Sequence, residues 1–202
     1  MPITKIALAS LAGGVTLFVW GALSHSILPF SESALHGFKS DDAVTRAILE
    51  NAPTSGIYFL PYIPQKSNGM PEEQFEATRK SAEEKMQQGP FVLASVRLGP
   101  MGLFGNYLTI QLLTDILTAL LVCLILVRTK DLVFKNAVVT SMCTGLTGFA
   151  AITLPEWNWY AFSTAFTLAE LFDIIVGFFL GGSVMAWILG RRGKSNLSEP
   201  VG

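Results

Sequence analysis

Apolar positions fill four long stretches of the chain, and a long mixed stretch separates the first of these from the second. The apolar stretches are residues 6–28, 108–127, 136–154 and 165–189. Crossing the hydrocarbon core of a bilayer takes about 20 mostly apolar residues in a helix. Because backbone groups in lipid must pair within their own segment, each stretch is predicted to form a transmembrane helix.

The mixed stretch, residues 29–107, has the pattern of a small folded segment. Two parts of it combine helical spacing of apolar residues with a serine or proline that starts a helix, and two others are rich in β-branched and aromatic residues. In chain order we expect a helix over 40–51, a strand over 56–63, a helix over 71–88 and a strand over 91–97. The predicted fold class is therefore a membrane all-α protein with a small external α/β cap between transmembrane helices 1 and 2.

Lysine and arginine residues predict the orientation of the four helices. They precede the first stretch, separate the second from the third and follow the fourth: Lys5, then Arg128, Lys130 and Lys135, then Arg191, Arg192 and Lys194. The positive-inside rule places both termini and the tail 190–202 in the cytoplasm, and residues 29–107 outside, which in a bacterium is the periplasm. The first stretch exceeds the apolar core of a cleaved signal peptide, so we expect it to stay as an anchor.

Composition agrees with a membrane protein and excludes one other class. The 202 residues are 50% hydrophobic and only 14% charged, whereas soluble domains carry about 25% charged residues. A formal net charge of −1 lacks the basic excess typical of proteins that bind nucleic acid. Both cysteines, Cys123 and Cys143, fall within predicted transmembrane helices, so the external segment has no disulfide.

Four ionisable residues fall within the predicted transmembrane helices, where such groups are costly and mark candidate functional sites. They are His25, Asp115, Glu170 and Asp173. At about 1.5 Å per residue, all four lie in the outer half of the bilayer. One interpretation is that they converge under the cap as a site for a cation or a proton. The other is that they pair with one another and with neighbours such as Gln111 to hold the helices together. No metal-binding spacing such as HExxH or CxxC occurs, so the sequence identifies no metal or cofactor.

Small residues at four-residue spacing mark faces where helices can approach closely. Gly177 and Gly181 form a GxxxG pair in the fourth stretch, and Ala137, Ser141 and Gly145 form a similar row in the third. Such rows serve either packing inside the chain or contact with a partner protein. Both interpretations remain open at this point.

Three strings of the sequence resemble a family of small bacterial membrane proteins with an N-terminal anchor, an external segment and three further spans. They are FVWGALSHSILPF at residues 18–30, QQGPFVLASVR at 87–97 and NWYAFSTAFTL at 158–168. The resemblance implies a bacterial inner-membrane location. It implies no activity and assigns a role to no residue.

These features favour a non-catalytic membrane protein, because neither a P-loop nor a GxSxG nucleophile motif occurs. We expect an accessory or assembly subunit, or an interaction module, of a larger membrane complex. Its expected partners are the lipid bilayer and either other membrane-protein subunits or a second copy of itself. The alternative is a small homo-oligomeric carrier coupled to an ion or a proton, which would use the carboxylate and histidine site.

Overall fold

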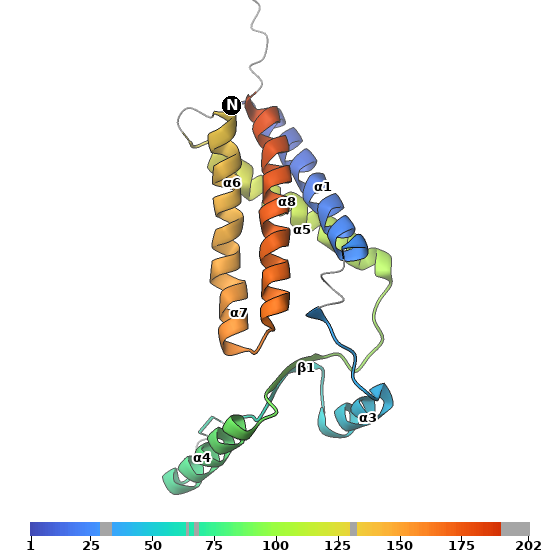
Figure 1. Ribbon diagram of the computed structural model, residues 1–202, viewed down its shortest axis with the longest axis vertical. Helices are drawn as coiled ribbons and strands as arrows, with labels where there is room; N and C mark the ends of the chain where they lie inside the picture. Colours follow the sequence, from blue (N-terminus) through green and yellow to red (C-terminus); the bar gives the residue numbers. More distant parts are fainter. Residues whose placement is uncertain (29–33, 64, 67–68, 130–132, 191–202) are drawn as a thin grey trace, which may run out of the picture. The chain divides into compact units, whose positions relative to one another are not determined.

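The computed structural model describes residues 1–28, 34–63, 65–66, 69–129 and 133–190, and within them four helices are long and apolar enough to cross a membrane. They are α1 (Ile3–Ile27), α5 (Phe104–Leu126), the continuous run Phe134–Trp159 and α8 (Thr164–Gly190), shown in Figure 1. The predicted all-α membrane class is confirmed at this level. Residues 191–202, which make up nearly all of the predicted cytoplasmic tail, lie outside the described residues.

The third membrane-length helix contains a change of helix type. It consists of α6 (Phe134–Gly148), a π-helical turn η1 (Phe149–Thr153) and α7 (Leu154–Trp159). Pro155 has no N–H to donate and crowds the carbonyl group of the preceding turn. A wider π turn directly before the proline relieves this conflict without ending the helix. The helix therefore continues beyond residue 154, where the apolar pattern predicted its end.

The transmembrane helices pack mainly in the pairs α1–α5, α1–α8 and α6–α8. Helix α5 crosses behind α8 in Figure 1 and also contacts α6 and α8. The buried core lies near the start of α1 and α6 and near the end of α5 and α8; it includes Ala9, Cys123, Leu126, Val138, Met185 and Leu189. We call this region the packed end. It coincides with the side that the sequence predicts to be cytoplasmic.

Residues 36–101 and 155–163 form a second compact unit. Its elements are α3 (Asp41–Asn51), β1 (Gly56–Leu60), α4 (Glu72–Gln88) and β2 (Val92–Val96), and the two strands pair antiparallel. All four elements fall within or close to the ranges that the sequence predicts. The Ser40 hydroxyl caps α3 by accepting a hydrogen bond from the Ala43 N–H at 3.3 Å.

Few side chains are buried in this second unit. Its fully buried residues among those described are Ala52, Pro61 and Ala82. A two-stranded sheet is marginally stable by itself, and burial of three small side chains adds little apolar stabilisation. The unit has the elements of an α/β segment without a substantial core.

Candidate functional site

One face of α8 brings Asp173 against α1. Asp173, Gly177 and Gly181 follow one another at four-residue spacing and therefore lie in one row along the helix. A β-carbon added at Gly177 would lie 3.1 Å from Cδ1 of Trp20, and one at Gly181 would lie 3.2 Å from Leu17. The glycines thus allow the backbone of α8 to approach α1 closely, and Asp173 meets the next residues along the same face of α1.

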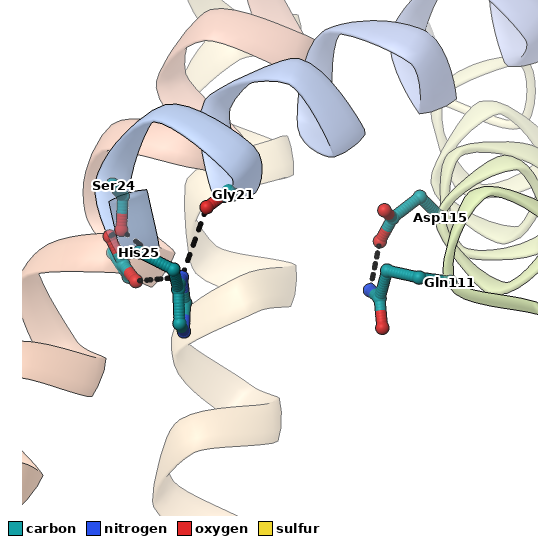
Figure 2. Close-up of polar contacts among 6 residues, drawn as sticks. Gly21, Ser24, His25, Gln111 and Asp115 are labelled. Carbon is teal, nitrogen blue, oxygen red and sulfur yellow. Dashed lines mark hydrogen bonds and ion pairs between the residues drawn. The ribbon is translucent and has the colours of Figure 1, made fainter. Parts of the chain in front are cut away.

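Those next residues are Ser24 and His25. The Ser24 hydroxyl donates to Oδ1 of Asp173 at 2.5 Å, and His25 Nδ1 lies 3.6 Å from Oδ2 of the same carboxylate (Figure 2). Nδ1 also lies 3.0 Å from the Gly21 carbonyl oxygen. Because a carbonyl oxygen only accepts, this contact places the imidazole proton on Nδ1. The Asp173 side chain is 20% exposed, whereas that of His25 is 65% exposed.

Ser24, His25, Glu170 and Asp173 line one pocket of about 230 Å³. Its remaining wall is apolar and consists of Ala34, Leu35, Phe166 and Ala169. The structure thus brings together three of the four ionisable residues that the sequence singled out. Two carboxyl groups and an imidazole can take up and release a proton. Among the described residues, no group of three or more His, Cys, Asp or Glu side chains has an arrangement that could hold a metal ion.

Asp115 lies apart from this cluster. On α5 it accepts a hydrogen bond from Nε2 of Gln111, one turn earlier on the same helix, at 3.1 Å (Figure 2). The Asp173 pocket is lined by residues of α1, α8 and positions 34–35, and Asp115 is not among its lining residues. The structure therefore brings His25, Glu170 and Asp173 to one pocket and leaves Asp115 outside it, contrary to the interpretation in which all four converge.

Both small-residue rows are covered by helices of the same chain. Gly177 and Gly181 face α1, and a β-carbon added at Gly145 would lie 2.6 Å from the Phe178 ring. Ala137 and Ser141 are buried, at 1% and 0% exposure. These five positions therefore form contacts between helices of one chain and offer no open face to a partner.

No protein-family model, curated protein or solved structure matches the chain. The resemblance to a family of small bacterial inner-membrane proteins stays a prediction.

Ser24 is the site residue that the sequence analysis did not single out. A usable signal existed, because Gly13, Leu17 and Ser24 recur on one face of α1 at spacings of four and seven residues. A helix that packs its glycine row against this face brings its next polar residue to Ser24. Recognising Ser24 in advance required knowing that α8, and not another helix, covers that face.

Proposed function

We propose that this chain is a non-catalytic integral membrane protein that acts as an accessory subunit or interaction module of a larger membrane complex. The observation that carries the proposal is the pair Gln111 and Asp115, which lies in a membrane-length helix. Among the described residues, no other helix contributes a hydrogen bond or ion pair to either side chain. A carboxylate at the centre of a membrane helix costs about 2.5–3.5 kcal/mol on insertion scales. Contact with another protein chain would offset that cost.

The second compact unit supports an interaction role independently. Several of its large apolar side chains are exposed, including Phe38 at 70%, Leu49 at 62% and Ile57 at 70%. Large apolar side chains that are exposed offer surface that a protein or a membrane can cover. Since this unit buries few side chains of its own, a partner that covers these residues would also stabilise it.

The proposed location is the bacterial inner membrane with both termini in the cytoplasm. It is supported by the lysines and arginines at residues 5, 128–135 and 191–194 and by the positive-inside rule. Alkaline phosphatase fused after residue 66 should be active, and the same enzyme fused after residue 202, which keeps the basic residues at 191–194, should be inactive. The reverse pattern would contradict this orientation.

The test of the interaction role is extraction of the full chain from its native membranes in a mild detergent, followed by a blue-native gel and mass spectrometry of the band. We expect a stoichiometric complex that contains more than one chain. A single copy of the 21.9 kDa chain, bound only to detergent and lipid, would contradict the proposal.

A second candidate function is a carrier coupled to a proton or a small cation, and the pocket around Asp173 is the observation that favours it. In proteoliposomes that contain a pH-sensitive dye, a carrier would release an imposed pH gradient. Asp173→Asn should abolish this release, whereas Asp115→Asn, outside the pocket, should preserve it. A gradient that persists with the unmodified protein would count against proton coupling.

A further inference from the structure

One line of positions along α5 has the spacing of a coiled-coil contact. Its members follow at intervals of four, three, four, three and four residues: Tyr107, Gln111, Thr114, Thr118, Leu121 and Ile125. Alternating intervals of three and four keep one side of a helix facing a partner helix over its length. We call these six positions the α5 seam.

The α5 seam does not face the core of its own chain. The buried side of α5 carries Ala119, Val122, Cys123 and Leu126. Gln111 and Thr114 of the seam are exposed, as is Leu121 at 55%. Helix α5 thus carries one side that packs within the chain and a second side on which Gln111, Thr114 and Leu121 are exposed.

The middle of the seam has a composition that lipid does not favour. It carries Gln111, Thr114 and Thr118, whereas the adjoining exposed side of α5 carries Leu113 and Leu117, at 60% and 54% exposure. Polar side chains of membrane helices almost always face protein or water-filled space. The leucine side is therefore suited to lipid, and the α5 seam is suited to another helix.

Gln111 has both a hydrogen-bond donor and an acceptor, so one Gln111 side chain can pair with another. Gln111 uses one of its two amide N–H donors on Asp115. Within the described part of the chain, its second N–H, its carbonyl oxygen and the other Asp115 oxygen have no partner. An amide with a spare donor and a spare acceptor can pair with an identical amide across a two-fold axis.

Membrane insertion also favours a pair of chains related by a two-fold axis. Copies of one chain insert with one orientation, so a two-fold axis that relates two of them runs along the membrane normal. Gln111 of both copies then lies at the same depth, and the two α5 helices run parallel. The small threonine side chains at 114 and 118 allow close approach of the helices.

We propose that the partner of the α5 seam is a second copy of this chain, with the α5 helices parallel and each Gln111 amide donating across the two-fold axis. The inference rests on the proposed interaction function and names its partner. In water-soluble coiled coils, one polar amide in the seam fixes the register and the number of strands, and Gln111 has that role in this pair.

Cysteine cross-linking in native membranes tests the pair directly. The full chain carries Cys143→Ser, which removes the exposed thiol, and keeps the buried Cys123. Thr114→Cys places a thiol on the seam, and Leu113→Cys is the matched control, exposed at the same depth on the lipid-facing side. After mild oxidation, Thr114→Cys should form a covalent species of twice the 21.9 kDa chain mass, and Leu113→Cys should not. Thr118→Cys is a second reporter in case Thr114→Cys inserts poorly.

Adding Gln111→Leu should lower the cross-linking yield of Thr114→Cys by about tenfold, because the hydrogen bonds across the axis are lost in both copies. The proposed pair is wrong if thiols at 113 and 114 give equal amounts of the cross-linked species. It is also wrong if Gln111→Leu leaves the amount formed by Thr114→Cys unchanged. If the seam thiols fail to cross-link but the blue-native band contains a different protein, the second copy is wrong and the interaction function stands. If the chain also migrates alone, both proposals fail.

Discussion

Two aspartates of the transmembrane helices have opposite surroundings. Asp173 accepts a hydrogen bond from Ser24 on a different helix and lies 3.6 Å from His25 Nδ1. Asp115, in the part of the chain that the structure describes, is bonded by Gln111 of its own helix. The first carboxyl group joins two helices, whereas the second, among the described residues, is bonded only within its own helix.

The difference arises from the residues that follow each aspartate along its helix. After Asp173 the same row continues with Gly177 and Gly181, which bring α1 close enough for Ser24 to reach the carboxylate. After Asp115 the corresponding position is Ala119, which is buried at the packed end. Helices α5 and α1 instead meet closely at Gly14, where an added β-carbon would lie 2.5 Å from Cα of Ile116. The close approach of α1 to α8 thus brings a donor to Asp173, whereas the close approach of α1 to α5 lies at Ile116 and, among the described residues, brings no donor from α1 to Asp115.

The largest effect is expected from filling that glycine row. Gly177→Leu places a branched side chain where a β-carbon alone would already lie 3.1 Å from Trp20. Separating α1 from α8 should lower the free energy of unfolding by about 3 kcal/mol. Thermal unfolding in detergent measures it, with Gly21→Leu as the control, because an added β-carbon there meets nothing within 4 Å. Equal losses in both variants would show that the row does not hold the helices together.

Removing the satisfied carboxylate should have the next largest effect. Asp173→Ala leaves the Ser24 hydroxyl without its acceptor on α8 and removes the contact with His25. Hydrogen bonds between membrane helices contribute up to about 1.7 kcal/mol, so we expect a loss of about 1.5 kcal/mol in the free energy of unfolding. Unfolding in a denaturing detergent measures this loss. An unchanged midpoint would mean that Asp173 contributes nothing to the packing of α1 on α8.

Ser24→Ala should cost less, about 0.6–1 kcal/mol, because only one neutral donor is removed. Combined with Asp173→Ala, it should add little further loss, since each substitution alone already breaks the same bond. A double-mutant cycle isolates the coupling between the two residues. If the two losses add fully, the hydroxyl and the carboxylate act independently and the short contact has no energetic role.

The elements of this fold were largely predictable because each depends on local pattern. Apolar length predicted the transmembrane helices, and the Ser40 cap and the Gly89 end predicted the helices of the second compact unit. The third helix is the exception. Pro155 and its polar neighbours mark a boundary in the sequence, and the π turn that lets the helix continue to Trp159 has no comparable signal.

The candidate site was predictable only in part. Glu170 and Asp173 share one pocket, as their three-residue spacing on α8 indicates. Which helix faces them depends on the order of helices in the bundle, and neither apolar length nor charge encodes that order. For the same reason Asp115 had the same pattern as Asp173 in the sequence, although Asp115 is not among the residues that line the Asp173 pocket.

The smallest effect is expected from changing Asp115, the second aspartate of the comparison. Asp115→Asn removes the charge but keeps an oxygen that can accept from Gln111, so the single chain loses no contact that the structure describes. At protein concentrations in detergent low enough to keep the chain monomeric, the free energy of unfolding should change by less than about 0.5 kcal/mol, as for other substitutions that break no buried contact. Asp173→Asn, measured under the same conditions, should lower the free energy of unfolding. An amide oxygen interacts with Ser24 and His25 more weakly than a charged carboxylate does. If Asp115→Asn destabilises the monomer as much as Asp173→Asn, Asp115 is satisfied within one chain. The polar side of α5 then needs no second protein to cover it.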